Sequence, residues 1–211
     1  MKRYVILISG RGSNMQALLD AQLPGECAAV ISNRPEAAGL AWAATRGVPT
    51  AVVNHKQYPS REAFDAALAE AIEQRGAEFV FLAGFMRILT EGFVQRFAGR
   101  LVNIHPSLLP AFPGLHTHEA ALQTGVRVHG CTVHFVTATL DCGPIIVQAA
   151  VPVLPGDTAQ ALAARVLQQE HIAYPQAAQG LLDGRCHLMD GRVVWRDDGT
   201  PATAALRVPS G

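Results

Sequence analysis

YVILISGRGSNMQALL, residues 4–19, contains a change of hydrophobic periodicity that restricts the folds open to the chain. Tyr4 to Ile8 is a short apolar run rich in β-branched residues, which is typical of a buried strand. Ser9-Gly10 ends this run, and the apolar residues that follow recur at helical spacing. The stretch therefore predicts a strand, a glycine-rich turn and a helix.

The same alternation continues to the centre of the chain. Further strands are predicted at 28–31, 48–53, 79–82 and 101–105, with helices between them at 37–46, 60–76 and 91–97. Alternation of this kind indicates a mostly parallel sheet that is covered by helices on both faces. Ligands of such sheets bind at the carboxyl ends of the strands.

The pattern changes after residue 128. VHGCTVHFV (128–136) and PIIVQAAVPV (144–153) are strand-like, and the connection TATLDCG is too short for a helical crossover. A helix over 158–174 with Asp157 as its N-cap and a hairpin over 186–196 complete the elements. The expected fold is α/β, with a Rossmann-like, mostly parallel sheet flanked by helices and antiparallel strands in the C-terminal half.

Length and composition restrict the class of protein. The 211 residues, 49% hydrophobic and 16% charged, predict one globular domain over 1–197, and we expect a disordered tail over 198–211. A net charge of zero gives no electrostatic footprint for nucleic acid or an anionic membrane, so a small-molecule partner is favoured. No stretch approaches the roughly 18 apolar residues of a membrane span, and we expect a cytoplasmic protein.

The first turn, SGRGSN at 9–14, is a candidate anion site. It leads from a strand into a helix, where free backbone N–H groups and the helix dipole attract negative charge. Gly10 and Gly12 allow close approach of the main chain, and Ser13 and Asn14 add side-chain donors. The turn matches neither the Walker pattern nor the full GxGxxG fingerprint, so a single phosphate fits best. The alternative is a tight turn without a ligand.

NIHPSLLPAFPG, residues 103–114, places an amide and an imidazole at the end of a predicted strand. Side chains two apart share one face of a strand, so Asn103 and His105 point the same way. Pro106 ends the ladder and keeps His105 out of helical geometry. A hydrogen-bonded structural histidine is the alternative, and the paired amide favours a catalytic role.

Asp141 lies in the loop TATLDCG, where a carboxylate is commonly a turn residue. If the fold brings it to His105, its negative charge would favour the protonated imidazole. The apolar stretch FLAGFMRIL, residues 81–89, is broken by Gly84 and either packs in the core or forms a wall of a pocket for a flat ring.

The chain also contains a cluster of histidines that invites a zinc hypothesis. The possible ligands fall between residues 105 and 134, and they are His105, His116, His118, His129, Cys131 and His134. Strand alternation weakens the hypothesis, because His129 and Cys131 face one way and His134 the other.

Taken together, the motifs resemble the glycinamide ribonucleotide formyltransferases, a folate-dependent family of purine synthesis. The resemblance covers about residues 4–185 and rests on six segments, namely LISGRGSNMQAL, ISNRPEAAGL, VFLAGFMRIL, LVNIHPSLLPAFPGLHTHEAAL, HGCTVHFVTATLDCGPIIVQ and QQEHIAYP. It implies formyl transfer from 10-formyltetrahydrofolate, as formyl-donor cosubstrate, to the amine of glycinamide ribonucleotide. It implies no metal and is compatible with a homodimer.

The resemblance also implies roles for individual residues. Asn103 and His105 would stabilise a tetrahedral oxyanion, and Asp141 would keep His105 protonated. Gly12, Ser13 and Asn14 would bind the substrate phosphate and Glu170 its ribose. The folate would contact Asn103 and further residues, namely Arg61, Met86, Arg87, Ile88, Leu89, Thr137, Ala138, Thr139, Leu140 and Asp141. Cys142 departs from the family pattern, because a small residue is expected after the catalytic Asp.

Other functions stay open. Formyltetrahydrofolate deformylase shares the NxH…D constellation but usually has an additional N-terminal domain, whereas the predicted fold begins at residue 4. Methionyl-tRNA formyltransferase would need an RNA-binding domain and a basic surface, which the length and neutral charge oppose. A regulatory module that binds the ligands without turnover and a zinc hydrolase are alternatives from other classes.

Overall fold

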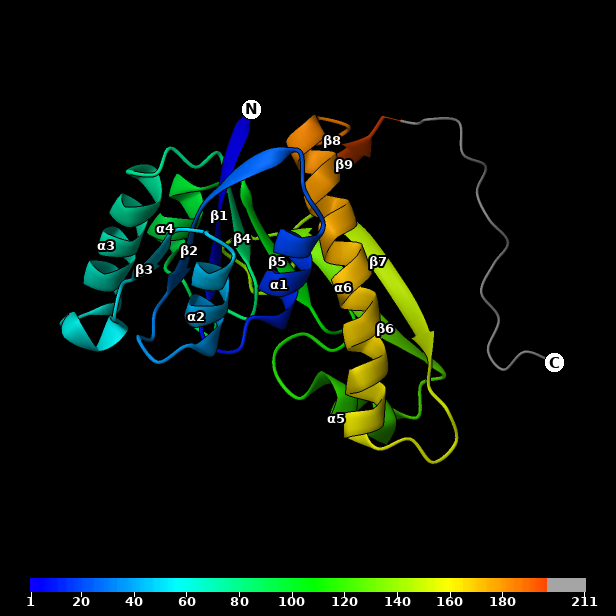
Figure 1. The fold of residues 1–211 in the computed structure, drawn as a ribbon. Coiled ribbons are helices and arrows are strands. Elements are labelled where there is room, and N and C mark those ends of the chain that lie inside the picture. Colours follow the sequence, from blue (N-terminus) through cyan, green and yellow to red (C-terminus); the bar gives the residue numbers. More distant parts are fainter. Residues whose placement is uncertain (197–211) are drawn as a thin grey trace.

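The computed structural model describes residues 1–196, and its main element is a seven-stranded sheet in the order β3-β2-β1-β4-β5-β6-β7 (Figure 1). Strands β1 to β5 pair in parallel, whereas β5–β6 and β6–β7 are antiparallel. The predicted fold class is therefore confirmed. The strands are β1 (Lys2–Ile8), β2 (Gly25–Ser32), β3 (Thr50–Val52), β4 (Phe79–Leu82), β5 (Leu101–His105), β6 (Val128–Phe135) and β7 (Ile145–Pro152).

The hairpin predicted at 186–196 is also present, as the separate pair β8 (Cys186–Met189) and β9 (Arg192–Trp195). The predicted tail 198–211 lies outside the described residues, and so does residue 197, where the predicted domain ends. The helices are α1 (Ser13–Asp20), α2 (Ala38–Thr45), α3 (Arg61–Glu73), α4 (Glu91–Arg96), α5 (Thr117–Thr124) and α6 (Ala159–Asp183), with a 3₁₀ turn η1 (His55–Gln57).

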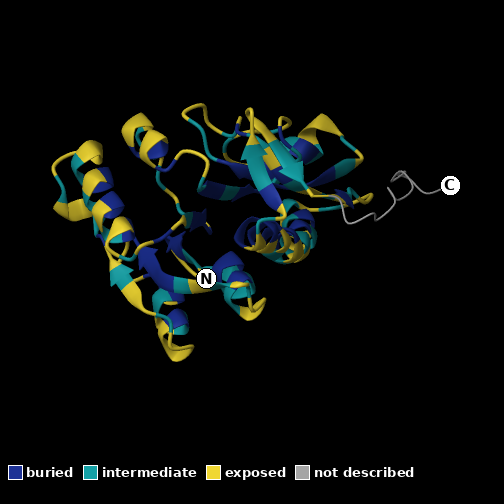
Figure 2. Cartoon of the chain, turned by 90° about the horizontal axis from the view of Figure 1, so that it is seen from above, coloured by how far each residue is buried: buried dark blue, intermediate teal, exposed yellow. Residues whose placement is uncertain are grey.

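Helices cover both faces of the sheet because the central strands are apolar on both sides. In β1, Tyr4, Ile6 and Ile8 pack in the core beneath α1, α2 and α6, and Val5 and Leu7 pack in the core beneath α3 and α4. Figure 2 shows the result, with buried residues in the strands and on the inner helix faces and exposed residues on the outside. Within residues 1–196, no helix combines the length and apolarity needed to cross a membrane.

The prediction for α6 was wrong at both ends. Thr158 is its N-cap and accepts a hydrogen bond from the Ala161 N–H, whereas Asp157 binds Arg165 at 2.7 Å. The helix continues through Pro175 to Asp183. The sequence patterns predict neither α5 nor η1, both of which the structure contains.

The antiparallel half of the sheet brings the predicted catalytic segments together. Asn103 pairs with His134 across β5 and β6, whereas the pairing of β6 with β7 shifts register between Val133 and His134. The end of β6 lies beside the start of β5, where the Val136 N–H donates to the Leu101 carbonyl at 2.8 Å. The loop 137–143 must therefore fold back along the sheet to place Asp141 near the carboxyl end of β5.

Close contact between β6 and β7 generates a prediction at Gly130. A Cβ at this position would overlap the carbonyl oxygen of Ala149, so Gly130→Ala must push the two strands apart. We expect this substitution to lower the free energy of unfolding by about 2 kcal/mol or more, measured by urea denaturation. The control is Gly92→Ala in α4, where a Cβ meets nothing within 4 Å and should stabilise the helix by about 0.5 kcal/mol. Equal stability of the two variants would contradict this account.

Candidate active site

Two cavities meet at the carboxyl ends of β4 and β5. One, of about 150 Å³, lies between the segment 82–94 and the loop 136–141, and we call it the Leu140 pocket. The other, of about 460 Å³, contains Glu170 and the start of α5 in its walls, and we call it the Glu170 pocket. Phe85 and Asn103 line both cavities. Two molecules, one in each pocket, would therefore meet beside Asn103.

The predicted catalytic side chains converge at this junction. The Nδ1 atom of His105 lies 3.6 Å from Oδ2 of Asp141, and both side chains are only 7% exposed. The same carboxylate oxygen accepts a hydrogen bond from the Gly114 N–H at 2.9 Å, and its other oxygen lies 4.0 Å from Nε2 of His134. The structure thus brings Asn103, His105 and Asp141 together from two distant segments of the chain.

His134 belongs to this cluster, although the sequence reading treated it only as a possible zinc ligand. Its Nδ1 lies 2.9 Å from the Phe135 carbonyl oxygen, which can only accept, so the proton of the neutral ring is on Nδ1. The Nε2 lone pair then faces the Asn103 Nδ2 at 3.4 Å and accepts one of its two protons. Burial lowers the pKa of His134, which agrees with a neutral ring. His134 therefore orients the Asn103 amide.

His105 is placed differently from His134. Its Nε2 lies 3.0 Å from the carbonyl oxygen of Phe112 and must donate to it. Its Nδ1 faces the carboxylate of Asp141 at 3.6 Å, which is longer than a hydrogen bond. Both ring nitrogens thus face acceptors. Nε2 is held by its hydrogen bond to Phe112, and Nδ1 is the nitrogen that is not held in this way.

The other end of the site is formed by α1 and α6. Asn14 donates from Nδ2 to Oε2 of Glu170 at 2.7 Å, and both residues are buried. Burial raises the pKa of Glu170, although the Asn14 hydrogen bond opposes this effect. The Asn14 side chain therefore already binds Glu170, so the groups of this turn that could bind an anion are its backbone N–H groups.

The start of α1 is the place where the sequence predicts an anion site. Gly12 is the N-cap, with φ 71°, and no side chain caps the free N–H groups of the first turn. Asn14 lines the Glu170 pocket, whereas Gly12 and Ser13 are not among its described lining residues.

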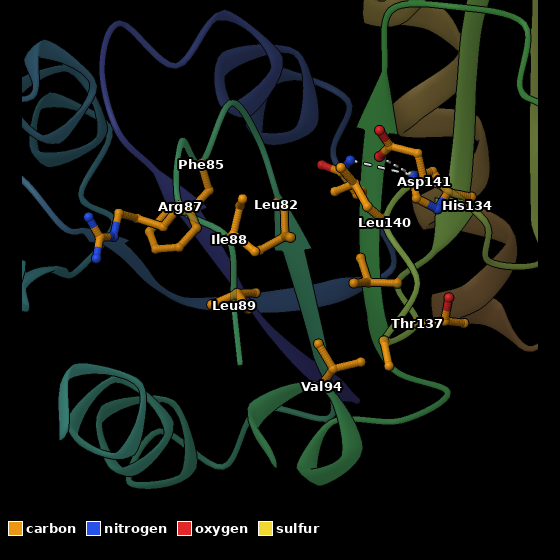
Figure 3. A pocket seen from close by; sticks show the side chains of 13 residues that line it. Leu82, Phe85, Arg87, Ile88, Leu89, Val94, His134, Thr137, Leu140 and Asp141 are labelled. Atoms are coloured by element: carbon orange, nitrogen blue, oxygen red, sulfur yellow. Dashed lines mark hydrogen bonds and ion pairs between the residues drawn. The ribbon is translucent and has the colours of Figure 1, made fainter. Parts of the chain in front are cut away.

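Most of the predicted folate contacts surround the Leu140 pocket, which Figure 3 shows from close by. Asp141 and His134 lie at one end of it, and Arg87 extends at the opposite end, with its guanidinium 5.6 Å from the Phe64 ring centroid. Three predicted contacts lie elsewhere. Met86 lines the Glu170 pocket, and Arg61 and Thr139 are not among the described residues that line either cavity. The residues found there as predicted are Arg87, Ile88, Leu89, Asn103, Thr137, Ala138, Leu140 and Asp141.

The remaining histidines do not form a metal centre. His129 faces His118 of α5, with 3.2 Å between their nitrogen atoms, and burial lowers the pKa of His129 to about 4. In the part of the chain that the structure describes, no three His, Cys, Asp or Glu side chains are placed to hold a metal ion. The zinc alternative therefore has no candidate ligand set in this part.

Comparison with known proteins gives a consistent result. The formyl transferase family model matches residues 2–178. The chain is 48% identical over 197 residues to the phosphoribosylglycinamide formyltransferase of Escherichia coli, and the match covers 92% of each. Its structure resembles glycinamide ribonucleotide transformylase 1 from Symbiobacterium toebii, with a TM-score of 0.90 and 50% identity, covering 93% of this chain and 95% of that one.

Longer relatives contain the same region as one part. The chain is 50% identical over 189 residues to the trifunctional purine biosynthetic protein adenosine-3 of Drosophila pseudoobscura pseudoobscura, a match that covers 87% of this chain. The chain spans only 14% of that relative.

The contacts of His134 predict its protonation state. In ¹⁵N-labelled protein, the His134 ring should show the pattern of a neutral imidazole with its proton on Nδ1. It should keep this pattern at pH 6.5, where an ordinary histidine is about half protonated, because burial disfavours the charged ring. Two-bond ¹H–¹⁵N correlation spectra measure this directly. A doubly protonated ring at pH 6.5, or a proton on Nε2, would contradict the hydrogen bond from Asn103.

Burial of Glu170 predicts a pH-dependent effect on stability. A carboxyl whose pKa is raised on folding stabilises the protein fully below its unfolded pKa, and this contribution is lost as the pH rises through the folded pKa. Glu170→Gln does not titrate, so its melting temperature should match the wild type near pH 4 and exceed it at pH 8. The gain is about 1.4 kcal/mol for each unit by which the pKa is raised. Exposed Glu36→Gln is the control, and a pH-independent difference at position 170 would refute the argument.

Proposed function

Because the chain belongs to the formyl transferase family, we propose that it transfers a formyl group from 10-formyltetrahydrofolate to glycinamide ribonucleotide in purine biosynthesis. The names and full-length coverage of the bacterial relatives support the substrates. The single structural observation behind the proposal is the junction of two pockets at Asn103, with His105 and Asp141 beside it. A transfer between two bound molecules needs such a junction.

In the proposed reaction, the glycinamide amine attacks the formyl carbon. A C–N bond forms to the amine and the carbonyl oxygen becomes an oxyanion, and collapse of this intermediate breaks the bond to N10 of the folate. The amine loses one proton, and N10 gains one as tetrahydrofolate leaves. The protein must therefore stabilise an oxyanion and move a proton over a short distance.

Asn103 and His105 are assigned to the oxyanion. One proton of the Asn103 amide binds His134, which leaves the second Nδ2 proton for the formyl oxygen. The His105 ring is held by Phe112 through Nε2, so Nδ1 is the nitrogen that can donate. Asp141, 3.6 Å from Nδ1, keeps the ring protonated and helps to route the proton to N10. The carboxylate and the positive ring together avoid an isolated buried charge.

The two substrates would bind on opposite sides of this cluster. We assign the phosphate to the backbone N–H groups of Gly12, Ser13 and Asn14, and the ribose to Glu170 in its pocket. The flat folate ring would lie in the Leu140 pocket, beside Asn103. The other residues around it would be Arg87, Ile88, Leu89, Thr137, Ala138, Leu140 and Asp141. Arg87, and Arg61 at the start of α3, would face the carboxylates of the folate tail.

The proposal is tested by replacing the oxyanion donors. Asn103→Ala and His105→Ala should each lower kcat about 100- to 1,000-fold, because each removes one donor to the developing oxyanion. The measurement is steady-state release of tetrahydrofolate at saturating concentrations of both substrates. His187→Ala, in β8 outside the two pockets, should keep wild-type activity.

The same assay separates transfer from hydrolysis. Tetrahydrofolate release by the wild type should require glycinamide ribonucleotide. Equal release without the amine would identify water as the acceptor and overturn the proposal. Unchanged kcat in both alanine variants would overturn the assignment of the donors.

A further inference from the structure

Tyr174 contacts the two strands that form the junction of the pockets. The side chain extends from α6 into the core and is fully buried. Its hydroxyl donates to the carbonyl oxygen of Leu82 at 2.9 Å and lies 3.1 Å from the carbonyl oxygen of Val102. A phenol has one proton, so the two carbonyls share it in a three-centre hydrogen bond. The hydroxyl thereby joins β4 to β5 from the helix side.

The two carbonyls lie shortly before the residues that line both pockets, one residue before Asn103 and three residues before Phe85. Leu82 is the last residue of β4 and leads into the segment that contains Phe85. Val102 is bonded to Asn103 in the chain. A shift of either carbonyl would therefore move Phe85 or Asn103 relative to both pockets. An error of about 1 Å at a reacting group can reduce a rate 100-fold.

Tyr174 lies on the same helix as Glu170, which lines the Glu170 pocket. Glu170 lies four residues earlier in α6, so both side chains project from the same face of the helix. Glu170 is held by Asn14 at 2.7 Å. One turn of α6 thus contacts the Glu170 pocket through its carboxylate and the strand of Asn103 through its phenol.

We propose that Tyr174 is a positioning residue, whose hydroxyl sets the place of Asn103 relative to Glu170. The inference rests on the proposed function, because the consequence of this placement is the alignment of the amine with the formyl group. Burial raises the pKa of Tyr174 well above its ordinary value, so the hydroxyl stays a donor at every pH at which the enzyme would work.

The role of the hydroxyl can be separated from that of the ring. The Tyr174 ring packs edge-on against Phe81, with 6.0 Å between centroids, and Tyr174→Phe keeps this contact while removing one oxygen atom. Tyr4 offers a matched control. It is also buried and packs edge-on against Phe81, at 5.4 Å, and like Tyr174 it lines neither pocket, but it lies in β1 and not in α6. Tyr4→Phe makes the same chemical change in the same core.

The experiment is a double-mutant cycle. Tyr174→Phe should lower kcat about tenfold or more, and change the KM of the folate less than about twofold, because it displaces a group that acts in the transition state. In the Asn103→Ala background the same change should cost less than about twofold, since the group it positions is gone. Tyr4→Phe should keep wild-type kcat. An unchanged kcat in Tyr174→Phe, or an equal loss in the two backgrounds, would overturn the proposal.

A measurement that does not depend on catalysis tests the positioning role even if the proposed reaction is wrong. The side-chain amide signals of Asn103 in ¹H–¹⁵N spectra report the environment of Nδ2. These signals should shift in Tyr174→Phe and stay in place in Tyr4→Phe. Shifted signals in a protein without formyl transfer would support the positioning role and reject the reaction. Unshifted signals would overturn the positioning role.

Discussion

The buried carboxylate of Asp141 is the constraint on which the arrangement of the site depends. A charge that is only 7% exposed destabilises the fold unless nearby groups compensate it. The Gly114 N–H donates to this carboxylate, and Nδ1 of His105 faces the same oxygen at 3.6 Å. One carboxylate thus ties β5 and the loop that follows it to the loop 137–143. The same contacts leave Asn103 and His105 facing the space where the pockets meet.

The two histidines of this cluster differ in the group that faces their second ring nitrogen. Each ring has one nitrogen against a backbone carbonyl, Phe135 for His134 and Phe112 for His105. The remaining nitrogen of His134 meets a donor, the Asn103 amide, whereas that of His105 meets the carboxylate of Asp141. The first ring is therefore held neutral as an acceptor, and the second presents Nδ1 to a carboxylate. Two chemically identical side chains thus differ because an amide nitrogen faces one ring and a carboxylate oxygen faces the other.

Local patterns predicted the elements well, because the strands of this sheet are apolar runs and the helices are amphipathic. The shared face of Asn103 and His105 follows from strand alternation alone, whereas the resemblance was needed to associate Asp141 with them. His134 was missed because its contact with Asn103 depends on the pairing of β5 with β6, which is not a local property. The end of α6 was missed because Pro175 is a stop signal. The helix continues since Ala177, Ala178 and Leu181 bury their side chains in the core, which offsets the roughly 3 kcal/mol that an internal proline costs.

The absence of a side-chain cap on α1 has a consequence for the life of the protein in a cell. A helix that begins at glycine without a capping hydrogen bond gives up a few tenths of a kcal/mol that a serine or aspartate cap would supply. Under the proposed function, a phosphate bound at this turn would supply the missing acceptors, and the occupied protein would unfold less often than the empty one. Proteases and chaperones act on unfolded chains, so their access would fall as the phosphorylated substrate becomes abundant. The steady-state amount of the protein would then follow the supply of its ligand without any change in synthesis.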